Sequence, residues 1–153
     1  MEKKNKFACA YQPILFYNKS ENYKFYQYAQ TVPNEFRSWT PTRDERLKGQ
    51  ISNLWTDIKF IYVGTVNHPE AVFKEGTNRK AHPCQMPLGL AIRPILFCTD
   101  KNDLVLDPFA GSGTVLVACK QLNREYIGFE ISKDYCNITN KRLEQENIQK
   151  FIK

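Results

Sequence analysis

The stretch LVLDPFAGSGTVL, residues 104–116, constrains the fold more than any other part of this chain. An apolar run ends at Asp107 and Pro108, the chain turns through Gly-Ser-Gly, and apolar residues then resume at helical spacing. A strand that leads through a glycine turn into a helix is the opening of a βαβ unit. The stretch therefore predicts an α/β fold, with a parallel sheet and covering helices.

The neighbouring sequence extends this pattern in both directions. Upstream, apolar residues at helical spacing between 88 and 96 predict a helix, which Pro94 should kink or shorten. From there on we expect a strand at 103–106, a helix at 114–122, a strand at 126–129, and a helix from Lys133 to about Gln149 capped by Ser132.

The first half of the chain is basic and aromatic. Residues 1–80 hold 13 Lys and Arg against 8 Asp and Glu, and 14 of the 20 aromatic residues. Two apolar runs, at 14–17 and 58–63, predict buried strands, and the sequence between them predicts irregular structure. Basic residues among aromatic ones suit a surface that contacts phosphates and stacks on bases. A solvated basic face over an aromatic core explains the composition equally well.

Composition excludes several classes of protein. No run of 18 apolar residues is present, and the basic N-terminus is followed by no apolar segment of a secretory signal. The five cysteines are scattered without a CxxC pair, and only two histidines accompany them. This pattern predicts no metal site, no membrane partner, and a cytoplasmic protein with reduced thiols.

The glycine turn predicts a ligand site. Asp107 and Glu130 each follow a predicted strand, and ligands of open α/β sheets bind beyond the carboxyl ends of the strands. Gly111 and Gly113 would let the backbone pass close to a ligand, and the next helix would offer it free N–H groups. Glu130 lies 19 residues after Gly111, the separation at which an acid commonly accepts ribose hydroxyls.

Two nucleotide motifs fail at this turn. A dinucleotide fingerprint needs a third glycine where Leu116 stands, and a P-loop needs a lysine where Thr114 follows Gly113. A nucleoside ligand without a pyrophosphate remains, and S-adenosylmethionine fits because it joins adenosine to an amino-acid group. A tight structural turn without a ligand is the alternative.

The run DPFAGSGTVLVACKQLNREYIGFEISKDYCNITNKRL resembles the C-terminal part of the amino-methylating DNA methyltransferases. These enzymes transfer a methyl group from S-adenosylmethionine to the exocyclic amino group of adenine or cytosine. The preceding HPCQMPLGLAIRPI resembles the segment that closes over the methionine end, with Met86 in place of the usual lysine. The resemblance implies part of a Rossmann-like sheet whose cofactor contacts are Asp107, Pro108, Phe109, Gly111, Ser112, Gly113, Thr114, Glu130, His82, Pro83 and Gln85.

The resemblance is strong over residues 80–145 and looser before them. It implies that 1–18 supplies a strand of the methyltransferase core, that 19–79 is a target-recognition region, and that 80–153 is the S-adenosylmethionine-binding βαβ region. DNA is the implied partner. Its expected contacts in the basic first half are Arg37, Arg43, Arg46, Lys48, Arg79 and Lys80.

The family orients its target amino group with a short motif, Asp/Asn/Ser-Pro-Pro-aromatic, which the family order would place before Phe7. The sequence contains no Pro-Pro dipeptide, so we assign no catalytic residue. Three interpretations stay open. In the first, which we expect, the chain is the cofactor-binding and recognition half of a DNA methyltransferase, completed by a second chain or by upstream sequence. It is a remnant that binds S-adenosylmethionine or DNA without transfer. Or it methylates RNA or a small molecule with an unrecognised residue.

Overall fold

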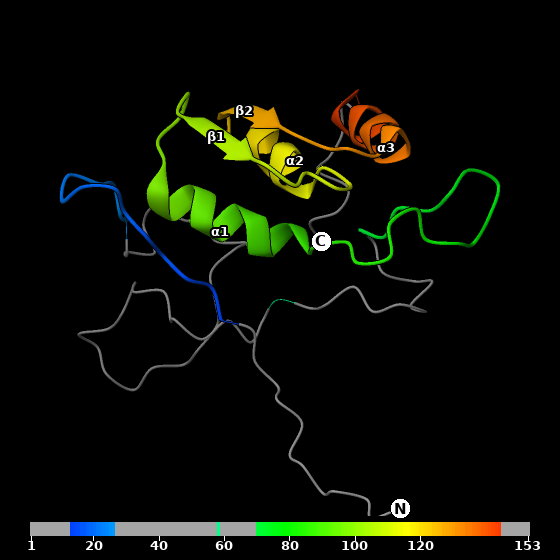
Figure 1. Cartoon of the computed structure of the whole chain (residues 1–153), viewed down its shortest axis with the longest axis horizontal. Coiled ribbons are helices and arrows are strands. Elements are labelled where there is room, and N and C mark those ends of the chain that lie inside the picture. Colours follow the sequence, from blue (N-terminus) through cyan, green and yellow to red (C-terminus); the bar gives the residue numbers. More distant parts are fainter. Residues whose placement is uncertain (1–12, 27–57, 59–69, 145–153) are drawn as a thin grey trace, which may run out of the picture.

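The computed structural model describes residues 13–26, 58 and 70–144. Within these ranges the chain forms a mixed α/β fold, in which two parallel strands alternate with helices (Figure 1). The predicted order of elements is confirmed. In sequence order they are α1 (Leu88–Cys98), β1 (Leu104–Asp107), α2 (Thr114–Gln121), β2 (Glu125–Gly128) and α3 (Lys133–Glu144).

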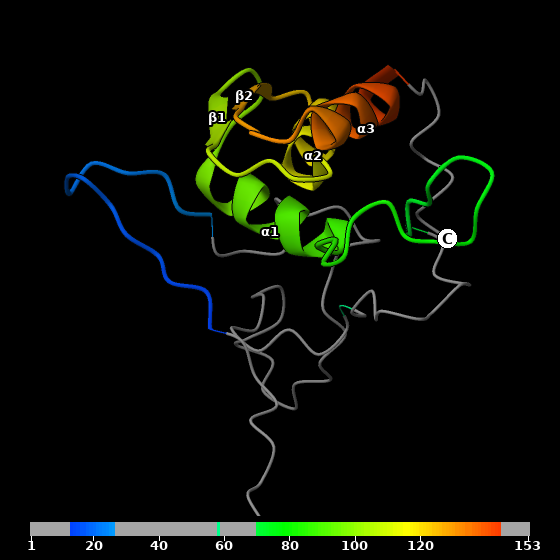
Figure 2. The same ribbon diagram turned by 45° about the vertical axis from the view of Figure 1, so that its right-hand side comes forward.

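The two strands pair in parallel, from Leu104 opposite Glu125 to Asp107 opposite Gly128. Alternate side chains of a strand point to opposite faces of a sheet. Val105 and Tyr126 accordingly turn toward the helices and pack against the core. Helices α1 and α2 lie on the same side of the sheet, and α3 lies beside α2 (Figures 1 and 2).

The core lies between α1 and α2. Ile92 of α1 and Ala118 and Cys119 of α2 are fully buried, and Val117 is nearly so. Pro94 lies inside α1 and does not end it, contrary to the expected shortening. The neighbouring apolar residues Ile92, Ile95 and Leu96 are buried. Packing of that apolar face outweighs the hydrogen bond that proline removes.

The strand predicted at 14–17 is wrong. Residues 13–26 form neither helix nor strand, and Ile14, Leu15, Phe16 and Tyr17 are all exposed. Phe16 instead packs against Tyr23 and Phe25 of its own segment. An apolar run of four residues does not by itself specify a strand, because a strand also needs a partner for its backbone groups.

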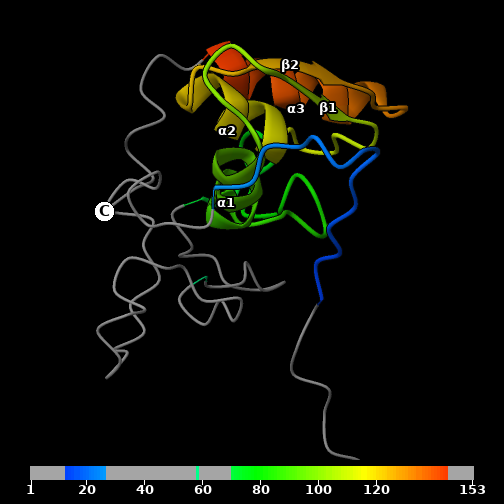
Figure 3. The same cartoon turned by 90° about the vertical axis from the view of Figure 1, so that its left-hand side faces the viewer.

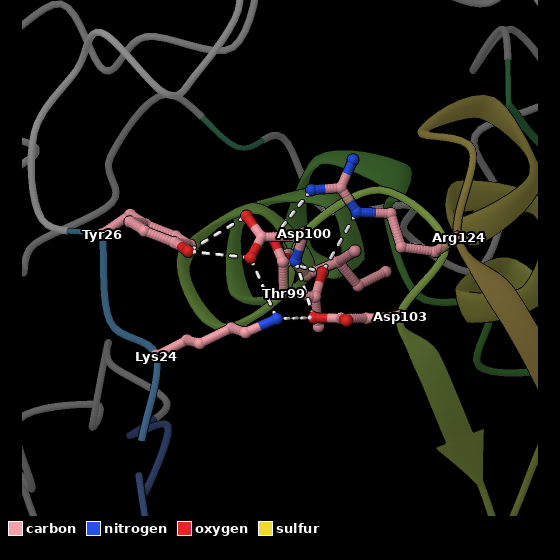
Figure 4. A network of polar contacts seen from close by, with 7 residues as sticks. Lys24, Tyr26, Thr99, Asp100, Asp103 and Arg124 are labelled. Carbon is pink, nitrogen blue, oxygen red and sulfur yellow. Dashed lines mark hydrogen bonds and ion pairs between the residues drawn. The ribbon is translucent and has the colours of Figure 1, made fainter. Parts of the chain in front are cut away.

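Residues 24–26 attach this segment to the corner between α1 and β1 (Figure 4). The ammonium group of Lys24 lies 2.6 Å from Asp103 and 2.9 Å from Asp100, and the hydroxyl of Tyr26 donates to Asp100 at 3.0 Å. The backbone N–H of Tyr26 also donates to the carbonyl of Phe97 at 2.8 Å. We call Lys24, Tyr26, Asp100 and Asp103 the corner network.

Charge pairing in the corner network shifts its pKa values. The hydrogen bond from Lys24 lowers the pKa of both Asp100 and Asp103, and the Asp103 carboxylate raises the pKa of Lys24. The Asp100 carboxylate raises the pKa of Tyr26. The network is therefore stable in the pH range where its carboxylates and ammonium group are all charged.

Several predictions lie outside the described residues. They are all but the first residue of the strand predicted at 58–63, the end of the last helix at 145–149, and the basic residues Arg37, Arg43, Arg46 and Lys48. None of the helices in the described part of the chain is both long and apolar enough to cross a membrane.

We predict that the corner network holds Tyr26 in place at neutral pH and releases it in acid, at a pH below the ordinary carboxylate pKa. A carboxylate with a lowered pKa contributes stability above its ordinary pKa, near 3.9, and loses it as the pH falls through the folded value. In the double variant Asp100→Asn, Asp103→Asn, the amide of Tyr26 should exchange faster at pH 7, as measured by NMR. Added salt should have the same effect on the wild-type chain, because these side chains are exposed.

Asp134→Asn is the control, because Asp134 lies on α3 outside the network. Unchanged exchange at Tyr26 in the double variant would show that the ion pairs do not hold the segment.

Candidate functional site

The glycine turn leaves the sheet at the carboxyl end of β1. A side-chain oxygen of Asp107 accepts the backbone N–H of Phe109 at 3.1 Å, which begins the turn. The strand pairing continues past the turn, because Phe129 donates to the carbonyl of Asp107 and accepts from Ala110, both at 2.9 Å. The turn is thus held against the chain that follows β2.

The carboxylate of Glu130 joins the two strand ends. One oxygen accepts the N–H of Gly111 and the other accepts the N–H of Ser132, both at 2.8 Å. The Ser132 N–H lowers the pKa of Glu130, and the Gly111 N–H acts in the same direction. The carboxylate is therefore ionised at neutral pH, and its two oxygens, which offer about four lone-pair sites, keep capacity for a further donor.

Side chains from one face of α3 donate hydrogen bonds to the backbone carbonyls of the glycine turn. The hydroxyl of Thr139 donates to the carbonyl of Gly111 at 3.1 Å. The guanidinium of Arg142 donates to the carbonyl of Ser112 and lies 3.3 Å from the hydroxyl of Thr114. Because Thr139 and Arg142 are three residues apart, they share one helix face. Neither residue was predicted from the sequence. Both lie on the half-buried face of α3 that carries Tyr135 and Ile138, and polar residues on such a face could have indicated contacts with a neighbouring segment.

The two glycines are required by packing as well as by backbone conformation. Gly113 has φ +78°, and a Cβ there would lie 2.5 Å from a methyl carbon of Thr139. Gly111 has φ +54°, and its Cβ would lie 3.2 Å from the Nε2 of His82. The expectation that the glycines leave room for a ligand therefore needs correction, since side chains of this chain fill both spaces.

The predicted segment before α1 lies against the turn. The ring of His82 stacks at a tilt on Tyr135 of α3, with 4.6 Å between centroids. Its Nδ1 accepts the N–H of Cys84 at 3.2 Å, so in the neutral ring the proton lies on Nε2, which faces Gly111. Pro83 is exposed beside it.

Gln85 and Met86 tie this segment to its surroundings. The buried Gln85 amide accepts the N–H of Val72 at 3.0 Å and donates to the carbonyl of Glu70 at 2.6 Å. The carbonyl of Met86 accepts the hydroxyl of Thr114 at 3.2 Å. In this structure Gln85 thus holds the preceding chain in place, through the backbone of residues 70 and 72.

The solvent-exposed part of the site consists of apolar side chains around the carboxylate of Glu130. Phe109 is 88% exposed and Ile131 is fully exposed, and both belong to the carboxyl edge that carries Glu130. An ionised acceptor beside exposed apolar side chains suits a ligand with paired hydroxyls and a flat ring. Pro108 belongs to the same turn. Of the residues predicted before α1, His82 lies beside Gly111, whereas Pro83 is exposed and Gln85 binds the backbone of residues 70 and 72.

Of the predicted DNA contacts, the structure describes Arg79 and Lys80. They lie in a hairpin in which Lys80 bridges to Phe73 and Ala81 donates to Val72 at 2.8 Å. Arg79 is exposed. A groove of about 680 Å³ separates the hairpin from α3, and its basic lining residues are Lys74, Lys141 and Arg142.

Comparison with known proteins identifies relatives that match this chain over almost its whole length. Residues 1–141 match the N6_N4_Mtase family, described as DNA methylase. The chain is 31% identical to the type II methyltransferase M.BglII of Bacillus subtilis over 150 residues, which is 92% of this chain and 38% of that protein. It is 30% identical to M1.MboII of Moraxella bovis over 161 residues, which is 95% of this chain and 58% of that protein.

A solved structure resembles part of the chain. M1.HpyAVI in complex with SAM shares 49% identity over 41% of this chain and 31% of that one, with a TM-score of 0.40. The chain thus spans between a third and three fifths of the two relatives that it matches almost throughout.

We predict that Gly113→Ala destabilises the fold more than Gly76→Ala. Both glycines have positive φ, so both substitutions strain the backbone, at a cost of about 1 kcal/mol. A new Cβ at position 113 would meet the side chain of Thr139, whereas a new Cβ at position 76 would have nothing within 4 Å. We expect a total loss of about 2–4 kcal/mol at 113, measured by urea unfolding. Equal losses would mean that α3 does not pack against the turn.

Proposed function

This chain belongs to the DNA methylase family, and from that premise we propose that it binds S-adenosylmethionine at the carboxyl edge of β1 and β2. We assign the described elements to part of a Rossmann-like sheet. The proposed reaction is methyl transfer to an exocyclic amino group of adenine or cytosine in DNA. M.BglII and M1.MboII, matched along almost the whole chain, are type II methyltransferases.

Glu130 is the single observation that carries the cofactor assignment. Its carboxylate is ionised, lies at the end of β2, and is fixed by two backbone N–H groups while keeping lone pairs free. A carboxylate held in this way accepts two neighbouring ribose hydroxyls without rearrangement. The exposed Phe109 and Ile131 supply apolar surface for the adenine ring on the same edge.

The remaining residues of the site position the ligand. The turn from Gly111 to Thr114 places the N-terminus of α2 toward the carboxyl edge, where free N–H groups favour a carboxylate. Thr139 and Arg142 hold this turn rigid by binding its backbone carbonyls. The cofactor, when bound, supplies an electrophilic methyl group on its sulfonium. We assign His82 and Pro83 to the wall at the methionine end.

Target recognition and base orientation require other parts of the enzyme. We propose that residues 19–79 form the recognition region, with Arg79 and Lys80 at its border, and that residues 80–153 form the cofactor-binding region. Orienting the amino nitrogen requires hydrogen-bond acceptors and a stacking ring for the flipped base. Because no Pro-Pro-aromatic motif occurs in residues 1–153, we propose that a catalytic half outside this sequence supplies them.

We predict that Glu130→Ala weakens S-adenosylmethionine binding by about 5- to 150-fold. The variant loses two hydrogen bonds to the ribose, worth about 1–3 kcal/mol together. Isothermal titration calorimetry measures the change. Glu125→Ala is the matched control, because Glu125 lies exposed at the opposite end of the same strand and should leave affinity unchanged.

Glu130 also ties the turn to Ser132, so urea unfolding of Glu130→Ala must accompany the titration. A folded Glu130→Ala variant with wild-type affinity would contradict the assignment of the ribose to this residue.

We predict that DNA binding depends on the basic residues of the first half. Neutralising Arg43, Arg46 and Lys48 to glutamine should weaken binding and lower the salt slope, by up to about 0.9 for each phosphate that the variant no longer neutralises. Fluorescence anisotropy with duplex DNA at several salt concentrations measures both.

The control is a triple glutamine variant of Lys101, Lys133 and Lys141, which has the same charge change in the second half. Equal losses in the two triple variants would show that only net charge matters, and that the first half holds no specific surface.

A further inference from the structure

Arg142 places a positive charge against the glycine turn. Its Nη1 donates to the carbonyl of Ser112 and lies 3.3 Å from the hydroxyl of Thr114. Ser112 and Thr114 are both buried, with exposed fractions of 4% and 3%. Helix α3, which carries Arg142, lies beside α2 in each view (Figures 1 and 3). The guanidinium therefore reaches the buried residues through which the turn enters α2.

The charge of Arg142 is not neutralised by an ion pair in the described part of the chain. The ion pairs found there are those of Lys24 and of Lys141, the neighbour of Arg142, which pairs with Glu75 at 3.0 Å. Burial lowers the pKa of Arg142 and the charge of Glu70 raises it, but an arginine stays protonated at neutral pH in either case. A half-buried cation of this kind favours an anion near the turn.

The start of α2 has the same electrostatic preference. Gly113 is its N-cap, and the first turn has neither a side-chain cap nor an acidic residue, so its N–H groups are left for another acceptor. Met86, whose carbonyl binds Thr114, has an uncharged side chain where the resembling segment usually has a lysine. Within the described ranges, Arg142 is thus the permanent cation in contact with this turn.

We propose that Arg142 is a positioning residue for the carboxylate of S-adenosylmethionine. The inference rests on the proposed function, in which a carboxylate of the cofactor binds at the start of α2. The carboxylate accepts N–H groups there, and Arg142 stabilises it electrostatically while fixing the Ser112 carbonyl of the same turn. Because the attraction acts on the negative charge of the ligand, it favours the amino-acid end of the cofactor and leaves the nucleoside unaffected.

The test compares two ligands that differ by the carboxylate alone, S-adenosylmethionine and decarboxylated S-adenosylmethionine. Isothermal titration calorimetry on the 153-residue chain measures both affinities, and their ratio is the readout. A variant that only loosens the turn lowers both affinities together and leaves the ratio unchanged. In Arg142→Gln we expect the ratio to fall by about 5- to 30-fold, the range for a charge at a partly buried helix terminus.

Three variants separate charge from structure. Arg142→Lys keeps the charge and should restore most of the ratio. Thr139→Val removes a neutral hydrogen bond to the same turn and should lower both affinities equally. Arg124→Gln is the matched control, because Arg124 also donates to backbone carbonyls, of Leu122 and Thr99, but at the opposite end of α2. It should leave the ratio unchanged.

A wild-type ratio in a folded Arg142→Gln variant, checked by urea unfolding, would overturn the inference. So would a ratio that falls as far in Thr139→Val, or one that Arg142→Lys does not restore. If Arg142→Gln does not fold, NMR of the wild-type chain decides. The Nε–H resonance of Arg142 should then shift more with S-adenosylmethionine than with the decarboxylated ligand, and equal shifts would overturn the inference. If the wild-type chain binds neither ligand, the proposed function itself fails, whereas an unchanged ratio with intact binding refutes only the role of Arg142.

Discussion

The hydrogen bonds of the Glu130 carboxylate are the contact on which the rest of the site depends. A sheet of two parallel strands has a single ladder of hydrogen bonds, which does little to fix the loops that follow the strands. Glu130 fixes them by accepting one N–H from the turn after β1 and one from the start of α3. Through Ser132 the same carboxylate sets where α3 begins, and so which face of α3 meets the turn. Thr139 and Arg142 then bind the carbonyls of that turn.

This arrangement separates two roles that glycine turns often combine. In the proposed site the backbone N–H groups and the Glu130 lone pairs serve the ligand, while the space beside each glycine is filled from within, by Thr139 at 113 and by His82 at 111. The site is therefore preorganised by intramolecular packing, and little rearrangement is needed when a ligand arrives.

Local signals in the sequence predicted the order of the elements and the positions of Asp107 and Glu130 at the ends of the two strands. Asp107, the glycines and Thr114 fall where the strand ends and α2 begins, because turn chemistry and apolar periodicity depend on neighbouring residues. The contacts of Arg142 with Ser112, and of Lys24 with Asp103, join residues far apart in the chain. Periodicity shows which face of a helix is apolar, but it does not show which segment that face meets. The run at 14–17 failed for the same reason, since its pairing depended on a partner that the sequence does not specify.

Helix α1 fixes both ends of the stretch between residues 26 and 70. Tyr26 binds the carbonyl of Phe97 near the end of the helix, and a carboxylate oxygen of Glu70 accepts the N–H of Leu88 at its start, at 2.7 Å. An 11-residue helix holds these two points about 15 Å apart. The two ends of this stretch are therefore held together by the helix, and doubling the length of a flexible chain between two such fixed ends costs only about 0.6 kcal/mol. On the proposed assignment of this stretch to target recognition, a change in its length would leave the geometry at the carboxyl ends of β1 and β2 intact, and target specificity would diverge independently of cofactor binding.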